Sequence, residues 1–153
     1  MLDIAGAKWR HGNQSRWAVR IRLGVTSENK RQQMANAKET LPKLMEMDGC
    51  IGACIVDSTS GMSLGAIGGN GIDLEAAAAG NTEVVRAKRK TMRALQLQDS
   101  IEDILITLGK AYHLIRPLQS NDALFVYLVL DKSRANLAMA RHQLRVIEKD
   151  LVV

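Results

Sequence analysis

The sequence predicts an α+β domain in which a five-stranded antiparallel sheet is covered by three helices. Five short apolar segments have the length and composition of β-strands, and turn residues separate most of them by only a few positions. Helical periodicity occurs at three places: before the first strand, between the second and third strands, and after the last strand. Runs of hairpin-connected strands with separate helices are typical of the α+β class, and 153 residues suit one domain.

The first helix is expected over Ala35–Met47. Asn36 is placed to cap it, with Glu39 three residues later as the returning partner of a capping box. Its apolar face consists of Leu41, Leu44 and Met45. Pro42 conflicts with a straight helix, so we expect either a kink or a start one turn later.

A β-hairpin follows the first helix. Gly49–Asp57 is a short apolar segment and predicts the first strand, and Met62–Ile67 predicts the return strand. The residues between them, Asp-Ser-Thr-Ser-Gly, predict a turn in which Gly61 takes a positive φ. Residues 68–71, Gly-Gly-Asn-Gly, end the second strand.

A long second helix is predicted over Asp73–Leu97. Asp73 is its N-cap, and four consecutive alanines at 76–79 favour helix. Three further strands are expected, with turns at 109–110 and 120–122: Ile104–Leu108, Ala111–Leu118 and Leu124–Leu130. A last helix, capped by Asp131 or Ser133, carries an apolar stripe spaced three and four residues apart: Leu137, Ala140, Leu144, Ile147 and Leu151.

Composition and charge exclude several classes of protein. The chain is 46% apolar and 24% charged, which excludes a disordered or fibrous protein. No apolar run approaches the roughly 20 residues that span a bilayer, and no apolar stretch follows the first positive charges, so we expect a cytoplasmic protein without membrane contact. Five aromatic residues are too few for a protein that stacks single-stranded nucleic acid on its rings.

The positive charge is concentrated in the first residues of the chain. Residues 1–37 carry seven Lys or Arg against two acidic residues, whereas residues 38–153 carry fourteen of each sign. We therefore divide the chain into a basic flexible leader, residues 1–36, and one domain, residues 37–153. A short strand at 18–25 is the alternative for part of the leader. The sequence that starts at Met34 is typical of a native start, so residues 1–33 are expected to be untranslated or dispensable.

The residues that could carry chemistry form no recognisable site. Cys50 and Cys54 lie about 13 Å apart on one strand, too far for a disulfide and without neighbouring zinc ligands. The three histidines are scattered and lie beside no nucleophile signature: His11, His113 and His142. Residues 65–71 are glycine-rich but lack the Gly-Lys-Ser/Thr ending of a phosphate-binding loop. We expect no catalytic residue, metal or cofactor, and hence no enzyme.

The second helix has two notable faces. A basic stripe spans about 100° of the helix circumference and consists of Arg86, Arg89, Lys90 and Arg93. A solvated face, an acidic partner surface and, less favoured, a nucleic-acid surface remain alternatives for it. The apolar arc is about 200° wide, twice what one buried side requires. Its bulky sector is Leu74, Val85, Met92 and Leu95, and its small sector is Ala76, Gly80, Ala87 and Ala94. The small sector would admit a second backbone, which indicates a partner helix.

The ordered set of segments resembles the Roadblock family, the roadblock-type dynein light chains and their bacterial and archaeal relatives. The matching segments are Gly49–Asp57 with the following Ser-Gly-Met at 60–62, Ile104–Leu108, Tyr112–Leu118, and Leu124–Asp131 leading into Ala-Asn-Leu at 135–137. The resemblance covers about residues 37–151 and implies a profilin-like fold, a homodimer and the binding or regulation of a Ras-like small GTPase. It supplies no catalytic residues. Some bacterial members stimulate GTP hydrolysis by repositioning groups of the GTPase itself.

These observations combine into one expected function, a bacterial, non-catalytic homodimer that binds and regulates a Ras-like small GTPase. The expected dimer interface is Ala76, Gly80, Val84, Ala87, Ala94, Ile104 and Ile106, and the basic stripe is the expected partner-binding surface. The apolar strand Ile104–Leu108, at the sheet edge of the resembling fold, would pair with a second copy. A structural adaptor without nucleotide dependence is the main alternative, and a nucleic-acid-binding regulator is a weaker one.

Overall fold

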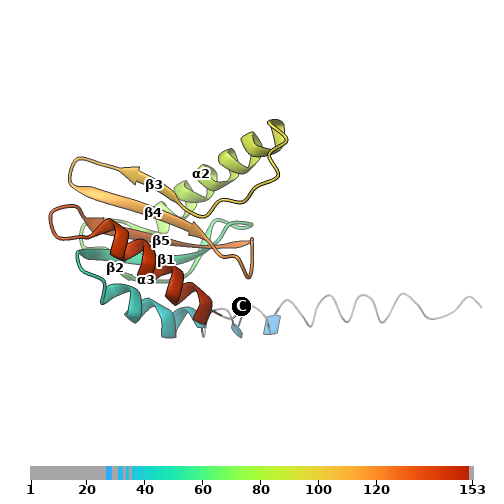
Figure 1. Ribbon diagram of the computed structural model, residues 1–153. Helices are drawn as coiled ribbons and strands as arrows, with labels where there is room; N and C mark the ends of the chain where they lie inside the picture. The colour runs from blue at the N-terminus through green and yellow to red at the C-terminus, as the bar shows by residue number, and fades with distance from the viewer. Residues whose placement is uncertain (1–26, 29–30, 33, 35, 152–153) are drawn as a thin grey trace, which may run out of the picture.

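The computed structural model describes residues 27–28, 31–32, 34 and 36–151, and these form three layers (Figure 1). The sheet has the strand order β2-β1-β5-β4-β3, and every neighbouring pair is antiparallel. Its strands are β1 (Cys50–Asp57), β2 (Met62–Gly68), β3 (Ile104–Thr107), β4 (Ala111–Pro117) and β5 (Leu124–Asp131). Helix α2 (Leu74–Ala94) covers one face, while the N-terminal helix, with helical residues 36–45, and α3 (Leu137–Asp150) cover the other. The predicted fold class is confirmed.

Alternation along the strands divides the interior into two cores. Leu114 and Leu128 face the N-terminal helix and α3, whereas Ile115 and Tyr127 face α2. Strand β5 lies at the centre of the sheet and is buried along nearly its whole length, because both of its faces are covered. Each strand begins or ends within two residues of its predicted limit.

The N-terminal helix begins before the predicted capping residue. Residues 27, 28, 31, 32 and 34 are helical too, so Asn36 lies inside a helix and accepts a hydrogen bond from the Gln32 side chain, 3.3 Å away. The predicted capping box is therefore wrong, because the residues upstream are themselves able to form helix. The alternative of a start one turn later than Ala35 is also wrong. Burial of Leu41 and Leu44 against the sheet offsets the unfavourable proline.

Helix α2 begins as predicted and ends three residues early. The Asp73 carboxylate accepts hydrogen bonds from the backbone N–H groups of Glu75 and Ala76, which confirms the N-cap. At the other end, Gln96 has a φ of 54° in the left-handed region. Its N–H bonds to the Arg93 carbonyl, and the next N–H bonds to the Met92 carbonyl. This is a Schellman motif, with glutamine where glycine is usual.

Helix α3 has a different cap from either predicted residue. The side chain of Asn136 caps it and accepts a hydrogen bond from the N–H of Met139. Asp131 instead accepts hydrogen bonds from both the N–H and the hydroxyl of Ser133, forming a local turn that delays the helix. The predicted apolar stripe of α3 does face the sheet, with Leu144 fully buried at its centre.

Part of the predicted leader lies outside the described residues, including the strand proposed for 18–25. The boundary after residue 36 and the dispensability of residues 1–33 stay predictions. Among the residues that the structure describes, no helix combines the length and the apolar character needed to cross a bilayer.

Candidate functional site: the α2–β3 face

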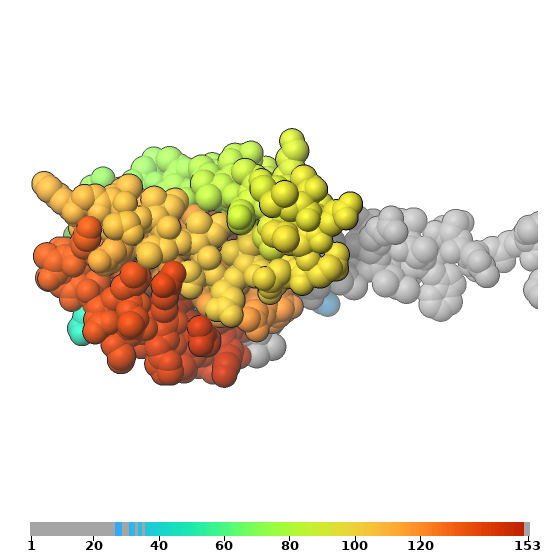
Figure 2. Space-filling view, turned by 45° about the horizontal axis from the view of Figure 1, so that its top comes forward, coloured from blue at the N-terminus to red at the C-terminus, as the bar shows by residue number. Residues whose placement is uncertain are grey.

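Helix α2 covers only part of its side of the sheet. It packs mainly on β1 and β2, so the edge strand β3 and much of β4 lie beside it rather than beneath it. In Figure 2 the strands β3 and β4, in orange, lie at the surface between α2, in green to yellow, and α3, in red. A groove of about 540 Å³ separates α2 from the start of β3 and is lined by residues that include Val84, Met92 and Ile104. We call this surface the α2–β3 face.

Two of the predicted interface residues, Val84 and Ile104, line this groove. The small residues of α2 are exposed: Ala76, Gly80, Ala87 and Ala94. Val84, Ile104 and Ile106 are half-buried. A Cβ atom added at Gly80 would meet no atom within 4 Å, so space for another chain lies directly over it. Strand β3 pairs only with β4 among the described strands, so its outer edge can accept another strand.

The bulky sector of α2 is less uniform than predicted. Leu74 and Val85 are buried against the sheet and Met92 is half-buried, but Leu95 is 62% exposed. The assignment of Leu95 to the sheet-facing sector is wrong, because the last turns of α2 extend beyond the sheet (Figure 1). Leu95 and Leu97, which is 49% exposed, add apolar surface at this end of α2.

A polar cluster that the sequence did not indicate lies under the α2–β3 face. The Tyr127 hydroxyl is 2.9 Å from His113 Nδ1, and the Asn81 side chain of α2 lies near that hydroxyl. Desolvation lowers the pKa of His113. Burial raises the pKa of Tyr127, although the nearby Asn81 side chain acts in the opposite direction. The sheet register brings these groups together, and the spacing of one histidine in a strand gives no sign of it.

The predicted basic stripe divides into two pairs with different surroundings. The Arg86 guanidinium donates hydrogen bonds to the carbonyl oxygens of Ser58 and Thr59, at 2.9 Å each, in the β1–β2 turn. Arg89 donates to the carbonyl oxygen of Asp122, 2.7 Å away in the β4–β5 loop. These two arginines therefore hold α2 against two hairpin loops, although Arg86 remains exposed.

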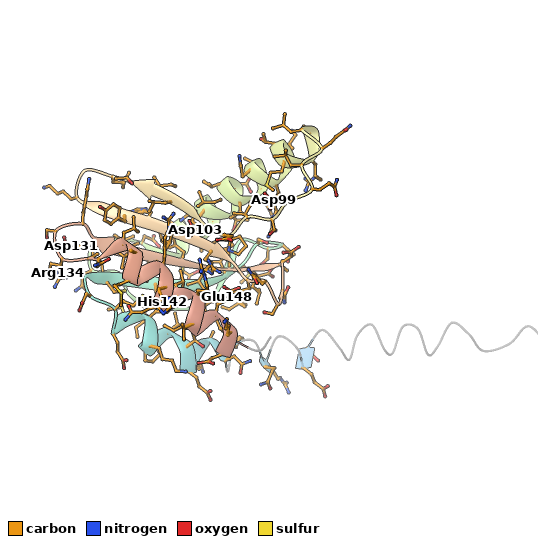
Figure 3. The ribbon with its side chains drawn as sticks, viewed as in Figure 1. Asp99, Asp103, Asp131, Arg134, His142 and Glu148 are labelled. Atoms are coloured by element: carbon orange, nitrogen blue, oxygen red, sulfur yellow. The ribbon has the colours of Figure 1, made fainter. Side chains whose placement is uncertain are left out.

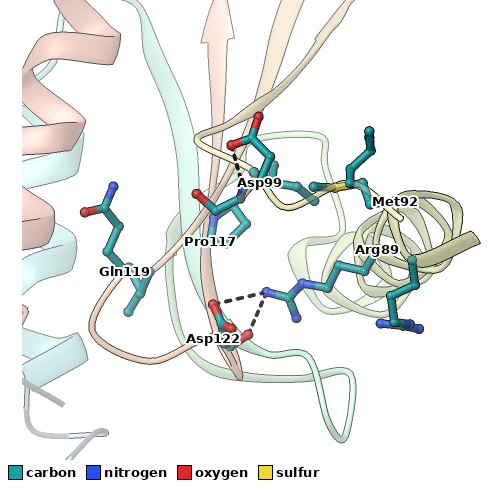
Figure 4. Close-up of a pocket in the computed structure, with 11 residues that line it drawn as sticks. Arg89, Met92, Asp99, Pro117, Gln119 and Asp122 are labelled. Atoms are coloured by element: carbon teal, nitrogen blue, oxygen red, sulfur yellow. Dashed lines mark hydrogen bonds and ion pairs between the residues drawn. The ribbon is translucent and has the colours of Figure 1, made fainter. Parts of the chain in front are cut away.

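The other two cations of the stripe, Lys90 and Arg93, are exposed. Arg93 lines a cavity of about 510 Å³ between the end of α2 and the β4–β5 loop (Figure 4). Its apolar wall includes Met92 and Pro117, and Asp122 lies on its rim beside Arg89.

A buried ion pair joins the sheet to α3. Arg116 Nε and Glu148 Oε2 are 2.5 Å apart, with the two side chains 3% and 7% exposed. Glu148 also accepts the backbone N–H of Gln119, and Arg116 donates to the carbonyl of Glu102. The pair connects four segments of the chain. Helical periodicity gives no sign of it, because Glu148 is next to Ile147 in the predicted apolar stripe and its charge favours a solvent-facing position.

The described residues present no arrangement typical of a catalytic or metal site. Cys50 and Cys54 are free thiols, and burial raises their pKa values to about 11 and about 12. The glycine-rich segment leads into the N-terminus of α2, where the Asp73 carboxylate already occupies the position an anion would take. No group of three His, Cys, Asp or Glu side chains among the described residues could hold a metal ion. His11 lies outside these residues.

Comparison with known proteins gives a consistent result at the level of fold. No protein-family model matches the sequence, and no curated protein matches it. Among solved structures, MglB from Myxococcus xanthus aligns with a TM-score of 0.64 at 14% identity, covering 81% of this chain and 87% of that one. The gliding protein MglB from Thermus thermophilus aligns with a TM-score of 0.64 at 15% identity, covering 78% and 87%.

A third solved structure carries the family name itself. The Roadblock/LC7 domain from Streptomyces avermitilis aligns with a TM-score of 0.61 at 9% identity, covering 72% of this chain and 88% of that one. The element order, the all-antiparallel sheet and these three alignments agree with the resemblance that the sequence showed. The chain has the Roadblock fold.

Proposed function

We propose that this protein is a non-catalytic, homodimeric module that binds and regulates a Ras-like small GTPase. The observation that carries the proposal is the uncovered α2–β3 face, where Val84 of α2 and Ile104 of the edge strand β3 line one groove and the small residues of α2 are exposed. The Roadblock fold supports the choice of partner, because the family resemblance implies GTPase regulation.

The α2–β3 face has the properties of a self-association surface. Small side chains at Gly80 and Ala87 allow a second helix backbone to approach closely, and half-buried Ile104 and Ile106 would lose their remaining exposure. A two-fold axis satisfies both surfaces at once, since helix pairs with helix and edge with edge. One similar solved structure is described as "MglB with tetrameric arrangement", which shows self-assembly of an MglB protein and supports it for this chain.

The basic side of α2 is the proposed surface for the GTPase. Lys90 and Arg93 are free to meet acidic groups, while Arg86 and Arg89 fix the neighbouring hairpin loops in place. A partner surface rich in carboxylates would be attracted to this side, and the effect would fall with increasing salt.

The dimer is tested by light scattering and sedimentation of the full chain at tens of micromolar. We expect a dimer for the wild type and a monomer or aggregate for Gly80→Leu, because the added side chain would separate two close helices. Ala87→Arg should act similarly by burying an unpaired charge. Glu83→Lys, on the outer arc of the same helix, is the matched control and should remain dimeric. A folded wild-type monomer would refute the dimer.

The partner is tested by binding to a Ras-like GTPase loaded with GDP or with a GTP analogue. A regulator should prefer one nucleotide state. Equal binding to both states would favour the structural adaptor instead. A salt titration with duplex DNA tests the nucleic-acid alternative, which predicts binding that weakens steeply with salt.

A further inference from the structure

A pair of hydrogen-bonded polar groups lies beneath the α2–β3 face, where only apolar packing would be expected. The Tyr127 hydroxyl on β5 is 2.9 Å from Nδ1 of His113 on β4, and Asn81 on α2 lies near that hydroxyl. Tyr127 is 1% exposed, whereas His113 and Asn81 are half-buried. The Tyr127 and His113 rings meet edge to face, with centroids 5.6 Å apart, which fixes their relative orientation. Each group is thus held by another element of the fold.

We propose that the hydrogen-bonded pair of Tyr127 and His113 makes self-association through the α2–β3 face depend on pH. The protein associates while His113 is neutral and separates when His113 is protonated. The inference rests on the proposed function, because it concerns the regulation of the same dimer surface.

The preference for a neutral histidine follows from the donors and acceptors of this pair. The Tyr127 hydroxyl can donate to Nδ1 of His113 only while that nitrogen is unprotonated. With a proton on Nδ1, the hydroxyl would accept from the imidazole, and its own hydrogen would have to turn to another acceptor such as the Asn81 amide oxygen. The neutral histidine keeps the buried hydroxyl paired without that rearrangement.

The other groups around His113 do not offset this preference. In the sheet, His113 pairs with Ile106 of β3 and Val129 of β5, which are apolar. Cys54 of β1 lies opposite Tyr127 and stays neutral, because burial raises its pKa to about 12. From α2, Lys88 lines the adjacent groove and adds positive charge. None of these groups stabilises an imidazolium.

Carboxylates occur near this region, but ion pairs direct them elsewhere. Asp103 pairs with Arg141 at 2.7 Å and Glu102 pairs with Arg145 at 3.7 Å, both on α3 across the sheet. Glu75, at the start of α2, acts on Cys54. Desolvation is the cause of the lowered pKa of His113.

Self-association would strengthen the preference for neutral His113. A second copy over the α2–β3 face removes the remaining solvent from the imidazole, and desolvation disfavours its charged form further. A pKa that is lower in the dimer than in the monomer means that dissociation takes up protons. The dimer is then favoured above the pKa of the monomer and is lost as the pH falls below it.

The test is the dissociation constant of the full-length dimer, measured by sedimentation between pH 5.5 and pH 8. A two-fold dimer contains two copies of His113, so the constant should rise by up to about a hundredfold for each pH unit below the transition. His113→Gln should remove this dependence, because glutamine does not titrate. His142→Gln, on the opposite layer in α3 (Figure 3), is the matched control and should retain it.

A second variant tests the hydrogen bond between Tyr127 and His113 rather than the histidine alone. Tyr127→Phe keeps the ring and removes the hydroxyl that donates to Nδ1, so the midpoint of dissociation should move to higher pH. A dimer whose dissociation constant is the same from pH 5.5 to pH 8 would overturn this inference and leave the proposed dimer standing. An equal pH dependence in His113→Gln would do the same. A wild-type monomer at every pH would overturn both.

Discussion

Replacing Glu148 by glutamine should be among the most destabilising conservative changes in this protein. The change keeps the shape of the side chain and its ability to accept the Gln119 N–H, but removes the charge that faces Arg116. Because these side chains are 3% and 7% exposed, the remaining guanidinium would be buried without a counter-charge. Removing one partner of a buried pair costs about 3–5 kcal/mol. A domain of this size has only about 5–15 kcal/mol of unfolding free energy.

The assay is urea unfolding followed by circular dichroism, with thermal melting beside it. We expect Glu148→Gln to lower the free energy of unfolding by about 3–5 kcal/mol and the melting temperature by roughly 10–20 °C. Asp150→Asn is the matched control, two residues along the same helix. It removes the exposed ion pair with Lys43, whose side chains are 51% and 64% exposed for Lys43 and Asp150, and should cost less than about 1 kcal/mol.

A double variant separates the charge from the contacts. Arg116→Met combined with Glu148→Gln removes both charges and keeps an acceptor for the Gln119 N–H. If the cost of Glu148→Gln comes from the unpaired charge, the double variant should be more stable than the single one by about 1–3 kcal/mol. A loss below about 1 kcal/mol for Glu148→Gln, or a double variant less stable than the single, would refute this reasoning.

Three further predictions concern single features of the fold and surface. Gln96→Gly should raise the free energy of unfolding by about 0.5–1 kcal/mol in urea unfolding, because glycine adopts the positive φ at this helix end without strain. An unchanged free energy of unfolding would show that the positive φ of Gln96 costs no stability. Lys90→Glu with Arg93→Glu should slow association with an acidic GTPase in stopped-flow measurements, with a loss that shrinks at high salt, and an unchanged rate would show a merely solvated face. Burial alone would raise the pKa of Asp57, but hydrogen bonds from its own turn lower the pKa overall. The ionised carboxylate should therefore stabilise the fold fully above about pH 4, and this stabilisation should be lost as the pH falls below that. In a plot of the urea midpoint against pH, Asp57→Asn should reduce the slope in this acidic range.

Local features of this protein could be predicted where short-range chemistry decides them. The strand Leu124–Asp131 was recognisable as a continuous apolar run, and the turn before Met62 as a cluster of small polar residues ending in Gly61. The cap at Asp73 followed from its position before the alanine run. Each of these depends on residues that are neighbours in the sequence.

Helix ends were harder to predict where several polar residues compete. Asn36, Asp131 and Ser133 were all plausible caps, yet the first lies inside a helix and the other two form a turn. Leu95 fitted the apolar arc of α2 by its angle, but the helix extends past the sheet at that point. Periodicity gives the direction of a side chain and does not reveal whether another element lies there.

The sequence by itself determined the class of the fold, the order of its elements and the two contrasting sides of α2, because apolar periodicity and turn chemistry act over short distances. Only the tertiary structure decided which polar groups meet. The pair of Arg116 with Glu148, the hydrogen bond between Tyr127 and His113, and the contacts of Arg86 with the β1–β2 turn join residues 14 to 32 positions apart. Strand register and helix placement set those contacts, and both result from the packing of the whole domain.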